Sequence, residues 1–149
     1  MDDMDLKILR VMQEDSSLPV TEVANQVGLS TSPCWKRINR LQKDGVIKRQ
    51  QAVLDSRQLG LGLTVFMFVK TGEHSGPWLE RFANFIKQMS EVQEFHRMAG
   101  EVDYLLKIVV SDMEQFDNFY KNMVENTPLS DVTSCFSMEV IKQTTALPI

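Results

Sequence analysis

Cysteine and histidine are scarce in this sequence, which has two of each among 149 residues. Cys34 and Cys135 lie far apart, and neither has a partner cysteine or a histidine pair at ligand spacing. This argues against a zinc site and a disulfide scaffold, and it fits a reducing cytoplasm. His74 and His96 are separate too, and no nucleophile motif accompanies them. We therefore expect a cytoplasmic protein without a metal or a catalytic centre.

Long apolar runs are missing as well. No run approaches the roughly 18–20 residues that a membrane span needs. The opening segment Met1–Asp5 is acidic, where a secretory signal is basic and then apolar. Gly60 and Gly62 lack the third glycine of a dinucleotide loop and precede a predicted strand. We expect no membrane partner and no cofactor, although a small-molecule enzyme in the second half of the chain stays open as an alternative.

What the chain does have is an uneven distribution of charge. Its net charge is −4, yet residues 30–50 contain a single acid, Asp44. The basic residues of that segment are Lys36, Arg37, Arg40, Lys43, Lys48 and Arg49. Such a cluster on an acidic chain suggests a basic patch with a function, whereas the plainer interpretation is a solvated helix face.

The first part of the chain has the pattern of a helix-turn-helix. We predict helices over about 3–15, over 20–27 and from Pro33 to about Asp44. Gly28 suits the left-handed position that ends a helix. Ser32 suits an N-cap and Pro33 the first helical residue. Two helices joined by such a glycine-containing turn are typical of DNA-binding domains.

The third predicted helix has an apolar back and a polar front. At about 100° per residue, Cys34, Ile38 and Leu41 share one narrow arc. The opposite arc holds Lys36, Asn39, Arg40 and Lys43, and Arg37 flanks the apolar arc. Basic side chains neutralise phosphates, and Arg or Asn pairs with base edges in the major groove. Free N–H groups at the Ser32 end can also meet a phosphate.

A small wing is expected after this helix. Residues 46–47 and 52–54 are rich in β-formers and flank a polar segment that contains Lys48 and Arg49. We predict that they pair as two strands whose basic tip touches the DNA backbone. The first domain would then cover 1–54, and the polar segment 55–62 would be a linker.

The remaining residues, 63–149, predict a second domain of another kind. Strands are expected over 63–70, 92–98, 103–110 and 131–143, and helices over 78–90 and 112–124. The order βαββαβ is the ferredoxin-like pattern, so the fold class is α+β.

Both faces of the predicted sheet are apolar. Val65, Met67 and Val69 alternate with Phe66 and Phe68 along the first strand. Two helices cover one face only, and a sheet face left in water is normally polar. A second copy of the same sheet is the simplest cover for the other face, because a two-fold axis makes one patch self-complementary. Docking of the first domain there is the alternative.

One short stretch of the second domain has the composition of a ligand loop. Gly100–Tyr104 contains a glycine, two acids and a phenol at a strand edge. Asp103 could hold an ammonium group, and loop N–H groups could hold a carboxylate. The alternative is an ordinary hairpin turn.

Taken together, these segments resemble the Lrp/AsnC, or feast/famine, family of bacterial and archaeal transcriptional regulators. Residues 5–9 resemble the family's opening helix, and 142–148 its C-terminal tail. Residues 27–34, with Arg37 and 45–47, resemble its DNA-reading unit, which adds Ser30, Thr31 and Ser32 to the expected DNA contacts. Residues 100–104 resemble its effector loop, although an aromatic residue is common in the family where Val102 stands.

The resemblance implies a winged helix-turn-helix domain, an amino-acid-binding domain, and dimers that assemble into tetramers or octamers. It places the effector in clefts between dimers. The expected effector contacts are Met98, Gly100, Glu101, Val102, Asp103, Tyr104, Thr133, Ser134 and Phe136. Apolar contacts from Met98 and Phe136 favour cysteine, methionine or leucine.

Residues 33–37 and 97–101 look most like a subgroup linked to cysteine detoxification. The alternative function is a stand-alone amino-acid-binding or metabolic protein whose first helices assist assembly. The basic front of the third helix favours the regulator, because an assembly helix has no need for it.

Overall fold

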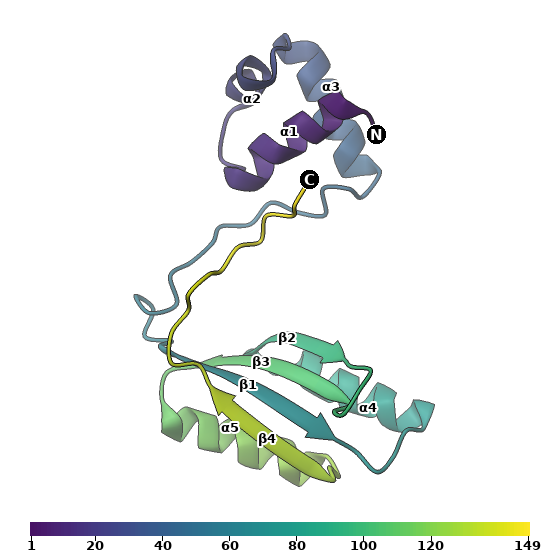
Figure 1. Cartoon of the computed structure of the whole chain (residues 1–149), viewed down its shortest axis with the longest axis vertical. Coiled ribbons are helices and arrows are strands. Elements are labelled where there is room, and N and C mark those ends of the chain that lie inside the picture. The colour runs from purple at the N-terminus through teal and green to yellow at the C-terminus, as the bar shows by residue number, and fades with distance from the viewer. The chain divides into compact units, whose positions relative to one another are not determined.

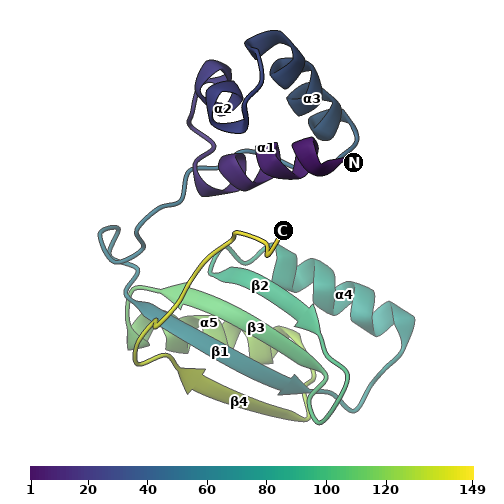
Figure 2. The same cartoon turned by 45° about the horizontal axis from the view of Figure 1, so that its top comes forward.

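The computed structural model describes all residues, 1–149, and divides them into two compact units (Figure 1; Figure 2). One unit consists of Met1–Leu54 together with Ile141–Ile149, and the other of Asp55–Val140. All of 63–149 is predicted to form the second domain, whereas the tail from Ile141 packs with the first unit.

The first unit is built from three helices, α1 (Asp3–Glu14), α2 (Val20–Val27) and α3 (Thr31–Lys43), close to the predicted ranges. Asp2 caps α1 in a reciprocal capping box with Asp5. Gly28 ends α2 with a φ of 74°, as expected for a left-handed C-terminal position. The shared core contains Ile8, Val23, Ala24, Val27, Cys34 and Ile38, all buried.

Helix α3 begins two residues before the predicted start. Its N-cap is Ser30, so Ser32 and Pro33 both lie inside the first turn. Proline is tolerated there because first-turn N–H groups have no intrahelical acceptor to lose. The expectation that Ser32 is the N-cap is therefore wrong.

The predicted pairing of 46–47 with 52–54 is also wrong, because the segment from Asp44 to Gly62 contains no strand. Ile47 packs against the helical core, but the side chains of Val53 and Leu54 are 86% and 70% exposed. A two-stranded ladder is marginal in water unless its apolar side chains are covered. Lys48 and Arg49 consequently lie on exposed, irregular chain.

The second unit has the expected βαββαβ order. Its elements are β1 (Leu63–Lys70), α4 (Gly76–Lys87), β2 (Val92–Arg97), β3 (Tyr104–Val110), α5 (Met113–Asn126) and β4 (Asp131–Phe136). The strands form one antiparallel sheet in the order β2-β3-β1-β4.

Strand β4 is much shorter than predicted. Its ladder with β1 begins where Lys70 faces Asp131, and the last bond runs from the Ser137 N–H to the Thr64 carbonyl. Strand β1 starts at Leu63, so a longer β4 would have no partner. The extended range 137–143 was therefore a wrong prediction.

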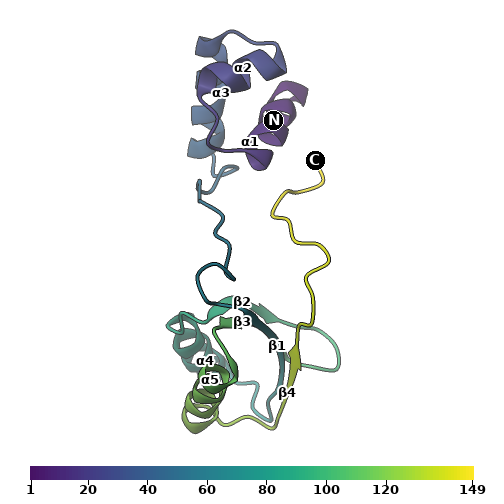
Figure 3. The same cartoon turned by 90° about the vertical axis from the view of Figure 1, so that its left-hand side faces the viewer.

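Helices α4 and α5 cover one face of the sheet (Figure 3). The core beneath them contains Val65, Met67, Val69, Leu106 and Ile108, each with no exposed surface. The opposite face is formed by half-buried side chains, among them Phe66, Phe68, Leu105, Lys107 and Val109. The two helices of the second unit leave this second face uncovered, and we call it the open face.

None of the helices is both long and apolar enough to span a membrane.

Candidate functional site

The exposed side of α3 carries the predicted DNA-reading residues. Cys34, Ile38 and Leu41 are buried against the other helices, which turns Lys36 and Lys43 to solvent. Asn39 lies half-buried between those lysines on the same side. Trp35, which is 55% exposed, borders this surface. The predicted division of α3 into an apolar back and a polar, basic front is therefore confirmed.

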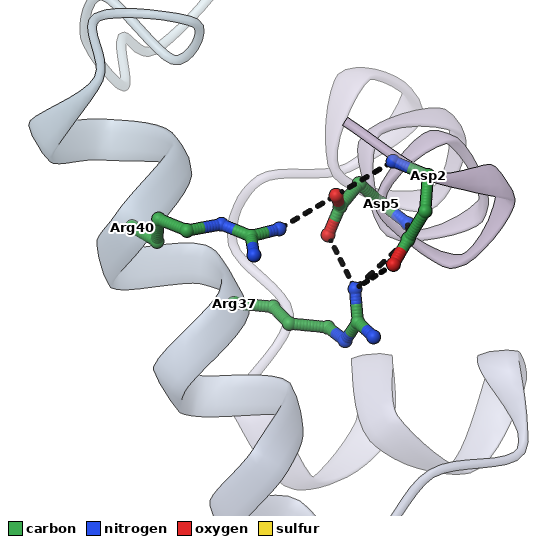
Figure 4. A network of polar contacts seen from close by, with 4 residues as sticks. All are labelled: Asp2, Asp5, Arg37 and Arg40. Carbon is green, nitrogen blue, oxygen red and sulfur yellow. Dashed lines mark hydrogen bonds and ion pairs between the residues drawn. The ribbon is translucent and has the colours of Figure 1, made fainter.

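Two arginines of α3 are held by acids of α1 (Figure 4). Nη1 of Arg37 donates to Oδ1 of Asp5 at 2.8 Å and to both carboxylate oxygens of Asp2 at 2.8 and 2.9 Å. Nη2 of Arg40 donates to Oδ2 of Asp5 at 2.6 Å. Figure 4 shows both guanidinium groups turned toward the α1 carboxylates. These contacts fix α3 against the N-terminal turn of α1.

The charges of this network stabilise one another. The hydrogen bond from Arg37 and that from the Asp5 backbone lower the pKa of Asp2 from 3.8 to about 2. Burial raises the pKa of Asp5, but hydrogen bonds from the Asp2 backbone and Arg37 outweigh it, so the net pKa is lowered. The same contacts raise the pKa of Arg37. All three groups are therefore ionised near neutral pH.

The two arginines differ in how many N–H donors they leave free for a ligand. The Arg37 side chain is 29% exposed and contacts two carboxylates, so its main role is to join α3 to α1. The Arg40 side chain is 50% exposed and contacts one carboxylate through one nitrogen. A guanidinium has five N–H donors, so Arg40 keeps donors for a second anion.

Sequence reasoning missed Asp5 as a partner of these arginines. The signal was present, because Asp5 stands three residues before Ile8 and seven before Met12 on the apolar side of α1. Asp5 has no exposed surface, and a buried acid requires a positive or hydrogen-bonding partner. An acid on an apolar stripe should have pointed to Arg37.

The first turn of α3 offers backbone donors beside the basic side chains. Ser30, Thr31 and Ser32 are exposed, and the Ser30 side chain makes no capping bond. The first N–H of this turn with a main-chain acceptor is that of Cys34, which donates to the Ser30 carbonyl. The N–H groups of Thr31 and Ser32 are left for an external acceptor such as a phosphate.

The predicted effector loop is a turn between β2 and β3, closed by a bond from the Met98 N–H to the Asp103 carbonyl. Oδ2 of Asp103 accepts from the Thr71 N–H at 2.8 Å, and the Asp103 N–H donates to the Val69 carbonyl. Asp103 therefore anchors the loop to the end of β1 and has its second carboxylate oxygen left for a ligand. The N–H groups of Gly100, Glu101 and Val102 make no hydrogen bond within the chain.

Other predicted effector residues lie apart from this turn. Tyr104 is 3% exposed and packs among Trp78, Phe82 and Phe95, and burial raises the pKa of its phenol. Its ring belongs to the core, so only its backbone can reach a ligand. The Glu101 side chain is 92% exposed and lies 3.8 Å from the Lys70 ammonium.

The residues predicted on β4 do not converge with the loop either. Thr133 faces Phe68 across the ladder and points to the open face, whereas Ser134 faces Met67 and points to the helix side. Phe136 stacks edge-on against Phe116, with ring centroids 5.2 Å apart. It lies four rows from the loop end of β1, about 13 Å away at the usual strand rise. Met98, at the end of β2, is 40% exposed.

Comparisons with known proteins match both halves of the chain. Residues 1–48 match the family described as winged helix-turn-helix DNA-binding, and residues 64–147 match the Lrp/AsnC ligand binding domain. The chain is 49% identical to the DNA-binding transcriptional activator DecR of Escherichia coli K12, over 100% of this chain and 99% of that protein.

Two solved structures share the fold over 99% of this chain. One is an AsnC family transcriptional regulator from Agrobacterium tumefaciens, with 50% identity, a TM-score of 0.97 and 97% of its own chain covered. The other is a transcriptional regulator from Neisseria meningitidis in complex with L-Met, with 34% identity, a TM-score of 0.95 and 96% covered.

Proposed function

The chain belongs to the Lrp/AsnC family of transcriptional regulators, and from that premise we propose which of its residues bind DNA and which bind the effector. It is a DNA-binding regulator with an amino-acid-binding domain, and not an enzyme. DNA is its partner through the first unit, and we propose that it acts in the cytoplasm.

We assign DNA binding to the exposed side of α3. The observation that carries this assignment is the division of one helix, with Cys34, Ile38 and Leu41 buried and Lys36 and Lys43 exposed on the other side. A helix enters the major groove with such a side, where lysines neutralise phosphates and an amide such as Asn39 pairs with a base edge. The free N–H groups of Thr31 and Ser32 would bind a backbone phosphate, as would the exposed side chains of Lys48 and Arg49.

Arg40 has a double role in this proposal. Asp5 fixes one of its nitrogens, and the remaining donors face a phosphate or a guanine edge. Arg37 supports DNA binding indirectly. Its ion pairs with Asp2 and Asp5 fix the angle between α3 and α1 and so orient α3.

A gel shift tests this assignment, using a duplex from the region upstream of the protein's own gene. Lys36→Ala should weaken binding, and Arg40→Ala should weaken it and also relax sequence preference. The matched control is Lys121→Ala, which removes an exposed lysine from α5 in the other unit. Equal affinities for all three variants and the unchanged chain would remove α3 from the interface.

We assign the effector to the turn between β2 and β3. The free N–H groups of Gly100, Glu101 and Val102 would bind the carboxylate of an amino acid, and the free oxygen of Asp103 its ammonium. Thr133, Ser134, Phe136 and Met98 are too dispersed in one chain to join the same pocket. Their participation requires a neighbouring chain, so we propose that the site is completed at a contact between dimers.

Isothermal titration calorimetry identifies the effector. Methionine, cysteine and leucine are the candidates, because the apolar side chains of Met98 and Phe136 favour an uncharged ligand, and glutamate serves as the charged comparison. The resemblance to the cysteine-detoxification subgroup makes cysteine the first to titrate. Asp103→Asn should abolish binding, and Asp117→Asn, an exposed acid of α5, should leave it unchanged. Equal binding by both variants would remove Asp103 from the site.

A further inference from the structure

The C-terminal tail, residues 144–149, belongs to the first unit, and its residues Leu147 and Ile149 are hydrogen-bonded to side chains of α1. The side-chain amide of Gln13 donates to the Leu147 carbonyl at 3.0 Å and accepts from the Leu147 N–H at 2.9 Å. One turn earlier, Nε of Arg10 donates to the main-chain oxygen of Ile149 at 2.6 Å. Two α1 side chains therefore bind two residues of the tail.

All of these bonds go to the main chain of the tail. The Leu147 side chain is 67% exposed, so it contributes little to the contact. A carboxamide that pairs with both the N–H and the C=O of one residue reproduces the pattern by which neighbouring strands pair. Such pairing selects an extended segment for its conformation and hardly at all for its side chains.

The tail is prepared for this contact by its own sequence. Pro148 restricts Leu147 to extended conformations, because the proline ring clashes with a helical residue before it. The Ala146 N–H donates to the Thr144 hydroxyl, and the Ile149 N–H donates to the Leu147 carbonyl. A segment ordered in this way loses less entropy on docking than a flexible one.

The surface of α1 that receives the tail is separate from its core side. Arg10 and Gln13 lie roughly opposite Ile8 on the helix, at 100° per residue. Leu6 and Leu9 share this outer side; they are half-buried but do not belong to the core of the three helices. Helix α1 thus has a second, partly apolar side, which a surface helix does not need when only one side faces a core.

We propose that the outer side of α1 is a docking surface for the chain's own tail, which it binds through the tail's main chain. The chain leaves the first unit at Leu54 and returns to it at Ile141. Docking therefore gives the first unit a second connection besides the 55–62 segment and restricts its freedom. The exposed side of α3 is not involved and stays available.

Chemical cross-linking of the full chain tests whether the chain's own tail occupies the outer side of α1. Ser16 and Thr145 are exposed and line one groove, so Ser16→Cys and Thr145→Cys are joined with a short bis-maleimide. Cys135→Ser removes the exposed native thiol, and Cys34 is fully buried. We expect a link within one chain, which runs as a monomer on a denaturing gel and whose intact mass is raised by that of one bridging linker. A link that gives a covalent dimer, or no link, would overturn the proposal.

Variants at one position then test the mode of binding. Leu147→Pro removes the N–H that Gln13 accepts, whereas Leu147→Ala keeps it. With limiting reagent, Leu147→Pro should slow the cross-link roughly fivefold, the effect of losing one net hydrogen bond. Gln13→Ala removes two hydrogen bonds and should slow it further. Leu147→Ala and the α1 control Lys7→Ala should leave the rate unchanged. A loss with Leu147→Ala as large as with Leu147→Pro would show that the side chain holds the tail and would overturn binding through the main chain.

Discussion

At the scale of the residue, Asp5 joins two helices through one carboxylate. It accepts from Arg37, from Arg40 and from the Asp2 N–H, so both of its oxygens are used and none of its surface is exposed. A buried acid with this many partners stabilises the packing of α3 against α1. Removing its charge leaves two guanidinium groups without their anion. The orientation of α3 therefore depends on a residue of another helix.

Asp5→Asn should lower the free energy of unfolding by about 1–3 kcal/mol, because it weakens the hydrogen bonds from two charged guanidinium groups. The loss is no larger because solvent screens the half-exposed Arg40. Urea unfolding monitored by circular dichroism measures the difference. Asp3→Asn is the matched control, since Asp3 stands in the same turn and is exposed. A loss as large in the control would mean that the helix dipole, and not the arginine contacts, accounts for the effect.

The same network predicts a dependence on pH. The pKa of Asp2 is lowered from 3.8 to about 2 in the folded chain. A lowered pKa stabilises the fold above the unfolded value and loses that contribution as the pH falls through the folded value. Stability should therefore fall between about pH 4 and pH 2. Because other acids contribute, the measured quantity is the difference between the unchanged chain and Asp2→Asn in urea unfolding, which should shrink across this range. A difference that stays constant would contradict the assignment.

At the scale of the element, local sequence predicted more than pairing patterns did. The periodicity of α1, α2 and α3 and the turn at Gly28 depend on neighbours within a few residues, so the sequence predicted their limits to within two residues. The wing and the end of β4 depend on pairing with segments far along the chain. The preference of a residue for strand conformation does not show whether such a partner is present. The Val53 side chain stays exposed because no other element packs against it. Phe136 is the last residue of β4 because its partner strand, β1, begins close to that point of the ladder.

The candidate site shows the same division. The exposed lysines of α3 followed from helical spacing, but the contact of Arg37 with Asp2 and Asp5 requires two helices to cross and was not predicted. In the effector loop, spacing could not show that the Tyr104 ring turns into the core or that Asp103 holds the Thr71 N–H.

The open face makes a prediction about assembly at this scale. If a second copy covers it, Val109→Glu buries a carboxylate without a partner, at a cost of several kcal/mol. The dimer should then dissociate at micromolar concentration, as measured by light scattering after size exclusion. Gln115→Glu adds the same charge on exposed α5 and should leave the dimer intact. An intact Val109→Glu dimer would place the interface elsewhere.

At the scale of the whole molecule, the two units divide the function. The first unit contains the basic cluster of residues 30–50 on a chain whose net charge is −4, and the second provides the effector loop. A ligand on one unit changes DNA binding by the other only if the ligand binds more tightly to one arrangement of the assembly than to another. This coupling requires that the exposed side of α3 binds the DNA backbone.

The dependence of DNA affinity on salt tests that claim most directly. Each phosphate contact contributes about 0.9 to the slope of log K against log salt concentration. For the full chain and one duplex, the double variant Lys36→Ala/Lys43→Ala should lower this slope by about 1.8, the sum of two such contacts. Lys121→Ala should leave the slope unchanged. A double variant with the slope and affinity of the unchanged chain would show that these lysines of α3 do not bind the DNA backbone.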